Sequence, residues 1–318
     1  VMYVPHTGQS GANAIGKILN GEVNPSGKTT DTFAYFTTEN APYAADAFYQ
    51  NGANNSKHIA YTEDIYIGYK WYETADKEGF FASKGTSYDK VVQYPFGYGL
   101  SYTSFEWTIK SVDIKKSGEE VSAALKNGDT VTDKNSKITV AVEVKNTGSV
   151  AGKDVVQLYM TAPYTKGKIE KPYVALTDFV KTETLYPESE ATGDKKNTEI
   201  VTLEFDLYDI ASYDCYDKNG NGFFGYELEK GNYVLSLRTS SHTKKGCEND
   251  EITFTLQEAI KFDKDPTTGE TVENRFTNYT LGGAEKKAYA SYAIDGSDFA
   301  GEKVKYLTRS DFKGTFPV

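Results

Sequence analysis

The clearest pattern in the chain is an alternation of apolar and polar residues in its second half. Apolar residues recur at every second position over residues 138–144, 201–207, 233–237 and 252–256. This spacing is typical of antiparallel strands with one face buried and the other in water. It predicts one antiparallel β-sandwich of the fibronectin type III or immunoglobulin kind over residues 104–257. The side chains expected to face inward are Val140, Val142, Leu203, Phe205, Leu235 and Phe254.

The predicted sandwich is longer than such a domain requires, because a seven-stranded example needs only ~100 residues. Three polar stretches account for the excess. Residues 116–136, 188–198 and 243–250 are therefore predicted to be insertions between strands.

The first 103 residues follow a different pattern. Residues 2–4 are apolar and indicate the end of a buried strand, and Ala14, Ile15, Ile18 and Leu19 then recur with helical spacing. A glycine at position 21 lies where a helix commonly stops. Together these features predict one strand–helix step of an α/β layer. Residues 29–36 are predicted to be extended, and residues 39–57 to form a long surface loop.

Residues 258–318 are polar and show no strong periodicity, so we expect an extended linker or strap there. The segment nevertheless keeps several aromatic residues: Tyr289, Tyr292, Phe299, Tyr306, Phe312 and Phe316. A disordered tail seldom retains so many rings, so a segment packed against the sandwich is favoured.

Composition narrows the class of protein. The chain has 318 residues, 38% of them hydrophobic and 25% charged, which suits roughly two packed domains. Its formal net charge of -10, without a basic block, argues against nucleic-acid partners, and it has no apolar run long enough for membrane insertion. Aromatic residues reach 14%, with 25 tyrosines, a level found in β proteins and carbohydrate binders. The high content of Tyr, Asn and Thr weakly favours an extracellular or cell-surface bacterial protein.

One loop resembles the start of a calcium-binding loop. Asp217, Asn219 and Asn221 place side-chain oxygens at alternate positions, and Gly222 follows at the sixth. The twelfth position is Leu228, where a calcium loop of this type needs Glu. The alternative is a plain hairpin tip built from Asn-Gly pairs, and this alternative is favoured. Calcium therefore stays a candidate ligand, and no cofactor is required.

For several further candidate residues, a structural role is the favoured interpretation. Gly27-Lys28-Thr29 lacks the upstream glycine of a phosphate-binding loop and suits a turn. The carboxylates of Glu63-Asp64 lie among aromatic residues and are expected to accept local hydrogen bonds. The tryptophans, Trp71 and Trp107, are favoured as core residues over sugar platforms.

The remaining candidates are single residues. His6, His58 and His242 lack metal-ligand spacing. Cys215 and Cys247 are expected to be free thiols, with a disulfide as the alternative.

Several motifs together resemble the C-terminal part of family-three glycoside hydrolases, which include many β-glucosidases. They comprise Asn24-Pro25-Ser26-Gly27-Lys28, the aromatic stretch 61–72, the Gly-rich stretch 94–103, and the sandwich motifs at 145–148, 156–159 and 208–213. Two departures are Asp64, where Gly is more usual, and Lys70, where Arg is more usual.

The resemblance implies a fold and a domain division. Residues 1–103 would be the end of the family's α/β-sandwich domain with a connecting segment, residues 104–257 its fibronectin type III-like domain, and residues 258–318 a linker or strap. The architecture is thus mixed: a partial α/β-sandwich remnant, an antiparallel β-sandwich and an irregular extension.

The resemblance also implies a function. The parent would be a retaining β-glycosidase acting on carbohydrate, whose catalytic Asp nucleophile and Glu acid/base lie outside this chain. This chain would then be non-catalytic, and its partners would be the barrel and the rest of the α/β-sandwich domain. The alternative is a β-sandwich module that binds carbohydrate or protein without enzymatic activity.

The resemblance further places residues 306–312 near the end of a connector found in family members with reversed domain order. It therefore predicts that the parent continues beyond Val318 into its barrel. Asp311 there only superficially resembles the family's nucleophile motif, because no buried apolar strand precedes it.

Overall fold

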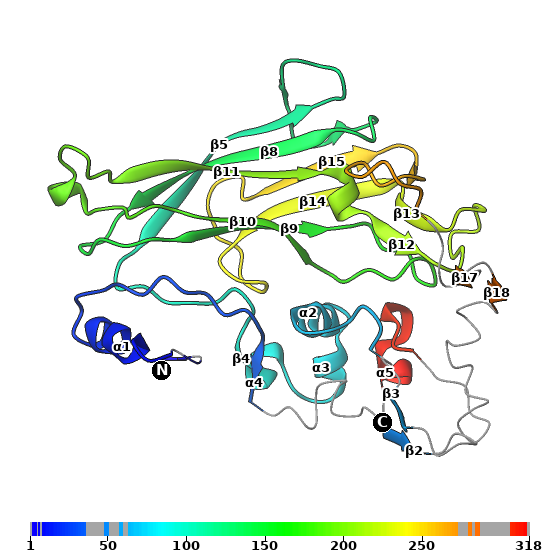
Figure 1. The fold of residues 1–318 in the computed structure, drawn as a ribbon, viewed down its shortest axis with the longest axis horizontal. Coiled ribbons are helices and arrows are strands. Elements are labelled where there is room, and N and C mark those ends of the chain that lie inside the picture. Colours follow the sequence, from blue (N-terminus) through cyan, green and yellow to red (C-terminus); the bar gives the residue numbers. More distant parts are fainter. Residues whose placement is uncertain are drawn as a thin grey trace.

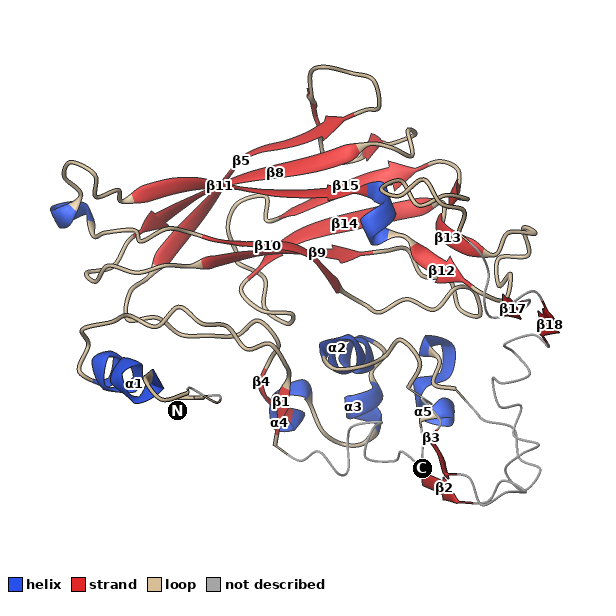
Figure 2. Cartoon of the chain, in the orientation of Figure 1, coloured by secondary structure: helices blue, strands red, loops and turns tan. Residues whose placement is uncertain are grey.

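A computed structural model of the chain describes residues 2–4, 6, 8–35, 63–272 and 306–316 in full, and the backbone of residues 48–50, 57–59, 279–281 and 284–286. A large β-sandwich forms one part of the molecule, and short helices lie beneath it (Figures 1 and 2). Within the described part of the chain, no helix is long and apolar enough to cross a membrane.

The sandwich consists of two facing sheets. The first has four strands in the order β11–β8–β5–β6, and the second has five in the order β10–β9–β14–β15–β7. All pairs are antiparallel except β15 with β7. The strands are β5 (Phe105–Lys115), β6 (Ala123–Ala124), β7 (Asp129–Thr130), β8 (Lys137–Asn146), β9 (Val155–Thr161), β10 (Ala175–Lys181), β11 (Thr198–Asp206), β14 (Gly231–Arg238) and β15 (Glu251–Leu256).

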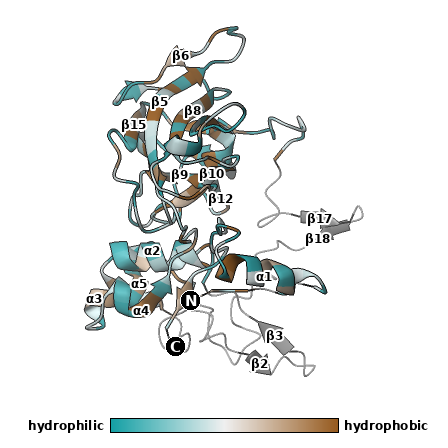
Figure 3. Cartoon of the chain, turned by 90° about the vertical axis from the view of Figure 1, so that its left-hand side faces the viewer, coloured by the Kyte–Doolittle hydropathy of each residue, from teal (hydrophilic) through white to brown (hydrophobic). Residues whose placement is uncertain are grey.

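The sandwich core confirms the predicted faces. All six side chains expected to point inward are buried, including Val142, Leu203 and Phe254, which are 0% exposed. Along β8 buried and half-buried residues alternate strictly, and along β11 buried and exposed residues alternate from Ile200 to Phe205. Both patterns follow the alternation of the sequence. Figure 3 shows this alternation as brown and teal bands on β5 and β8.

The sandwich carries a small third sheet of three strands in the order β12–β13–β16. They are β12 (Ser212–Asp214), β13 (Gly225–Leu228) and β16 (Ile260–Phe262). Strand β16 lies beyond residue 257, and its Phe262 is 2% exposed and belongs to the sandwich core. The packed β-structure therefore extends past the stretch of strong alternation.

The N-terminal part contains the predicted helix α1 (Gly11–Leu19), which ends at Asn20, with Gly21 following at φ +80°. After it, β1 (Phe33–Ala34) pairs with β4 (Val92–Tyr94). Strands β2 (Phe48–Gln50) and β3 (Lys57–Ile59) also pair, so the stretch expected to be only a loop contains a strand rich in aromatic β-formers. The rest of the expected loop lies outside the described residues.

A second core lies beneath the sandwich. Helices α2 (Tyr69–Lys77), α3 (Phe80–Ser83) and α4 (Tyr88–Val91) bury aromatic side chains against one another, and we call them the helical unit. Trp71 is 1% exposed within it, and Trp107 is 2% exposed in the sandwich core. Both tryptophans are therefore core residues, as the sequence favoured.

The C-terminal segment differs from the expectation of no regular element. Backbone strands β17 (Tyr279–Leu281) and β18 (Ala284–Lys286) pair, and a 3-10 turn at Arg309–Asp311 leads into α5 (Phe312–Thr315). Leu307 and Phe312 join the core of the helical unit. The helix α5 has only four residues, so it is too short to show a periodic pattern in the sequence. Its contacts with the helical unit hold it in place. Tyr289, Tyr292 and Phe299 lie outside the described residues.

Candidate functional site

Most of the motifs singled out in the sequence meet at one place, the junction between the N-terminal part and the sandwich. The motif at 208–213 lies elsewhere, beside the third sheet. The chain after Asn24 runs beside the Gly-rich stretch: Thr29 N–H donates to the carbonyl of Tyr98, and Gly97 N–H donates to the carbonyl of Thr29, both at 2.8 Å. A Cβ atom at Gly99 would lie 2.2 Å from the carbonyl oxygen of Gly27. The two segments approach so closely that only glycine fits at position 99.

Asn24 links three segments through its amide. Its Oδ1 accepts hydrogen bonds from Ser101 Oγ at 3.0 Å and from Tyr102 N–H at 2.8 Å, while its Nδ2 donates to the carbonyl of Ala151 at 3.1 Å. A Cβ at Gly152 would come within 2.4 Å of the same amide. Asn24 therefore ties the α1 turn to the Gly-rich stretch and to the sandwich at once.

The sandwich contributes Asn146 to the junction. Thr103 Oγ1 donates to Asn146 Oδ1 at 2.8 Å, and Asn146 Nδ2 donates to the carbonyls of Val150 and Leu185. Asn146 is 1% exposed, and buried amides of this kind hold their segments in one arrangement because each unmet hydrogen bond is costly.

A charged pair completes this side of the junction. Lys28 Nζ lies 3.4 Å from Asp154 Oδ1 and donates to the carbonyl of Gly99 at 3.1 Å. The other oxygen of Asp154 accepts from the Trp107 indole N–H at 2.9 Å. Lys245 lies over the Trp107 ring, 4.5 Å from its centroid. Burial lowers the pKa of Lys245, and Asp154 opposes this shift. Lys28, expected to lie in a turn, is thus a partly buried structural cation.

A second polar contact joins the helical unit to the sandwich. Glu73 of α2, 3% exposed, accepts from Tyr88 Oη at 2.6 Å and from Ser241 Oγ at 2.9 Å. Nδ1 of His242 lies 2.9 Å from its second oxygen, and the His242 ring stacks on Tyr88 at 3.7 Å. Burial acts to lower the pKa of His242, but the carboxylates of Glu73, Asp76 and Asp89 outweigh it and raise that pKa.

The sequence did not reveal this pairing. Glu73 and His242 are separated by 169 positions, and neither belongs to a motif that marks the contact. Of the other two histidines, His6 is exposed on the N-terminal segment, and the side chain of His58 lies outside the described residues.

The remaining candidate residues have local roles. Asp64 is exposed and sits at φ +52°, in the left-handed region that glycine adopts most easily. Its neighbour Glu63 is 8% exposed. Asp311 caps α5 by accepting from Gly314 N–H at 2.8 Å. Cys215 and Cys247 are free thiols, and burial raises the pKa of Cys215 to about 11.

The loop with the calcium-like pattern forms the tip of the β12–β13 hairpin, which confirms the hairpin prediction. Asp217 accepts backbone N–H groups of Asn221 and Gly222, at 2.8 and 3.1 Å. Asn219 and Asn221 both donate their side-chain N–H groups to Glu227, which is 0% exposed. Among the described residues, no three His, Cys, Asp or Glu side chains gather as metal ligands.

A buried lysine lies beside the loop. Lys171, 2% exposed, forms an ion pair with Glu229. Burial lowers its pKa to about 8, and the nearby carboxylates of Glu227 and Asp214 oppose this effect. The Lys171 ammonium group thus supplies positive charge to the carboxylates of Glu229, Glu227 and Asp214.

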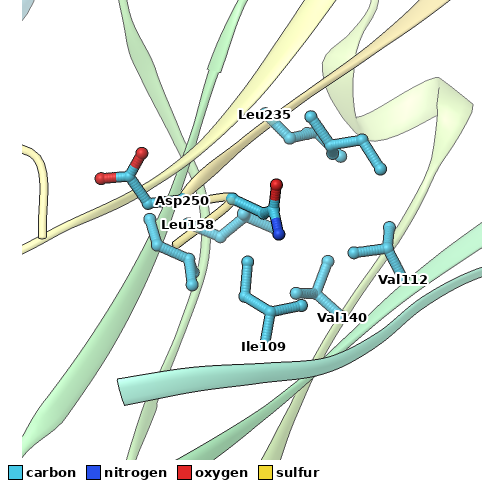
Figure 4. Close-up of a pocket in the computed structure, with 9 residues that line it drawn as sticks. Ile109, Val112, Val140, Leu158, Leu235 and Asp250 are labelled. Carbon is cyan, nitrogen blue, oxygen red and sulfur yellow. The ribbon is translucent and has the colours of Figure 1, made fainter. Parts of the chain in front are cut away.

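The described sandwich holds a cavity of about 10 Å³ between its sheets (Figure 4). Core aliphatic side chains line most of it, including Ile109, Val140 and Leu235. The space admits roughly one water molecule, so a sugar ring does not fit there.

Comparison with known proteins gives a family match over the N-terminal part. Residues 1–69 match the Glycosyl hydrolase family 3 C-terminal domain. The chain is 38% identical over 233 residues to beta-glucosidase A of Butyrivibrio fibrisolvens, covering 73% of this chain and 24% of that protein. It is 35% identical over 247 residues to a beta-glucosidase of Ruminococcus albus, covering 78% of this chain and 21% of the relative. The chain therefore spans about a quarter of the length of these relatives.

Solved structures agree with this match. A beta-glucosidase from Paenibacillus barengoltzii superposes with a TM-score of 0.59 at 32% identity, over 79% of this chain and 22% of that one. Beta-glucosidase 3B from Thermotoga neapolitana, in complex with glucose, gives a TM-score of 0.55 at 31% identity, over 80% of this chain and 28% of that one. The fold, the motifs and these relatives identify the chain as a C-terminal region of the family 3 glycoside hydrolases.

Proposed function

We propose that this chain is the non-catalytic portion of a retaining β-glycosidase that hydrolyses terminal β-glucosides or related oligosaccharides. The relatives are named beta-glucosidases, and this chain matches only part of each. The nucleophile and the acid/base would lie in the remaining domains. This chain would support those domains through the junction.

The observation that carries the proposal is the exposed apolar side of α1. This helix contains no buried residue, and Leu19 is 71% exposed. Tyr3, on the segment before it, is 69% exposed. A helix of an α/β layer normally packs its apolar stripe on a sheet, and no described element covers α1 in that way. Figure 1 shows α1 lying apart from α2, α3 and α4. The rest of an α/β-sandwich domain would supply the missing cover.

A rigid junction suits this supporting role. A retaining mechanism needs two carboxyl groups about 5–5.5 Å apart, and a small displacement of catalytic groups costs much of the rate. Asn24 and Lys28 connect the segment after α1 to the sandwich through partly buried polar contacts, and Gly99 packs closely against Gly27 in that segment. The sandwich would therefore hold the edge of the α/β domain in one position.

The test uses two separately produced polypeptides, this chain and the remaining domains of its parent, with an aryl β-glucoside as substrate. We expect no turnover by this chain alone, and activity when both are combined. Gly99→Ala should reduce the recovered activity, while Gly27→Ala, whose Cβ would meet nothing within 4 Å, serves as the matched control. Turnover by this chain alone, lost on mutating one of its own residues, would overturn the proposal.

A further inference from the structure

Residues 306–316, which we call the strap, lie between the helical unit and a loop of the sandwich. Figures 1 and 2 show α5 beside α2 and α3, below the sandwich. The strap has little internal structure, because α5 contains only four residues. Its conformation must therefore come from the surfaces that it contacts.

The apolar half of the strap contacts the helical unit. Phe312, 4% exposed, packs edge-on against Tyr66 with ring centroids 5.1 Å apart. Phe316 lies 5.0 Å from the Phe80 ring and 6.1 Å from the Trp71 ring. Anchoring aromatic side chains of this kind dominate the affinity of many peptide interfaces.

The polar half contacts Glu170 of the sandwich. One Glu170 oxygen accepts from Thr308 Oγ1 at 2.6 Å, and the other accepts from Arg309 N–H at 2.9 Å and from the Tyr66 hydroxyl. Burial and the Glu170 carboxylate raise the pKa of Tyr66, so this hydroxyl stays protonated as a donor. Glu170 thus binds the strap and the segment before α2 together.

Arg309, 7% exposed, bridges the same two parts of the molecule. Its Nε donates to Glu78 at the end of α2 at 2.8 Å, and its Nη1 donates to the carbonyl of Lys171 at 3.3 Å. The guanidinium also lies over the Tyr164 ring, 4.3 Å from its centroid. Removing the Arg309 side chain would leave Glu78 without its ion-pair partner.

We infer that the strap is an intramolecular peptide ligand, and that the surface formed by Tyr66, Phe80, Tyr164 and Glu170 recognises it without needing a covalent connection. Thr308 and Arg309 find hydrogen-bond partners on this surface, and Phe312 and Phe316 fill its apolar side. The recognised chemistry is a short peptide with an arginine followed by two spaced phenylalanines. This interaction surface is independent of the proposed glycosidase function.

The test uses the full chain with a protease site inserted between Ala290 and Ser291. After cleavage, we expect the strap fragment to co-elute with the body on size exclusion, and excess synthetic 306–316 peptide to displace it. Arg309→Ala or Phe312→Ala should weaken retention roughly tenfold or more. Lys313→Ala, at an exposed position of the strap, is the matched control. Immediate loss of the fragment from the unmutated cleaved chain would overturn the inference.

A second measurement keeps the inference testable if the cleaved chain aggregates. In the uncut protein, hydrogen exchange of α2 and α3 amides should accelerate in Arg309→Ala and Phe312→Ala, and stay unchanged in Lys313→Ala. Equal exchange in all three variants would show that the strap merely rests on the surface.

Discussion

Gly99 lies so close to Gly27 that a Cβ atom on it would come within 2.2 Å of the Gly27 carbonyl oxygen. Gly99→Ala should therefore push two backbone segments apart and lower the free energy of unfolding by roughly 1–3 kcal/mol. Urea unfolding measures the loss. The reciprocal variant Gly27→Ala meets nothing within 4 Å, so it should be nearly neutral. Equal effects of both would contradict this account of the junction.

Asp64→Gly is expected to stabilise the chain. The Asp64 backbone sits at φ +52°, where a side chain costs energy that glycine does not pay. The gain should be about 0.5–1 kcal/mol in the free energy of unfolding. Asp64→Ala removes the same carboxylate but keeps the strained backbone, so it separates the two effects. A gain from both variants would instead show that the Asp64 carboxylate, which Glu170 repels, is itself unfavourable in the folded state.

The sandwich could be predicted from the sequence because its signal is local. A residue such as Val142 or Leu203 shows its buried face through its immediate neighbours in the chain. The junction could not be predicted in this way, since Asn24 meets Ala151, and Glu73 meets His242, across more than a hundred positions. The family motifs indicated which residues matter there, but not what they contact. Phe312 is a similar case, because its helix forms only against the helical unit.

The contact between Glu73 and His242 should make stability depend on pH. Folding raises the pKa of His242 above its ordinary value of 6.5, because Glu73, Asp76 and Asp89 outweigh the effect of burial. The folded state therefore binds this proton more tightly than the unfolded state. The resulting stabilisation is fully present below pH 6.5 and is lost as the pH rises through the higher folded pKa.

Denaturant unfolding between pH 6 and 8 should show this loss in the unmutated chain and a flatter profile in His242→Gln. The difference between the two profiles isolates His242 from other groups, including Lys171, whose pKa of about 8 also falls near this range. Parallel profiles for both proteins would mean that His242 does not titrate with folding.

Lys171→Met is expected to destabilise the chain strongly. It would leave Glu229, Glu227 and Asp214 buried or half-buried without their nearby cation. Breaking a buried ion pair from one side costs roughly 3–5 kcal/mol, and thermal unfolding would show it as a lower Tm. Lys166→Met, at an exposed position of the same loop, should have little effect. Adding Glu229→Gln to Lys171→Met should recover part of the loss.

Calcium should stabilise the unmutated chain little. The loop carries Leu228 at the twelfth position, so it lacks the bidentate carboxylate that sets affinity in such loops. Asn219 and Asn221 direct their side-chain N–H groups to Glu227, and Asn221 Oδ1 accepts from Phe223 N–H at 2.9 Å, so these amides are engaged within the hairpin. Thermal unfolding with and without calcium in millimolar excess is the measurement. Asp217→Ala should lower the Tm equally in both conditions, because Asp217 fixes the turn through backbone N–H groups. A rise in Tm with calcium that Asp217→Ala abolishes would establish a metal site instead.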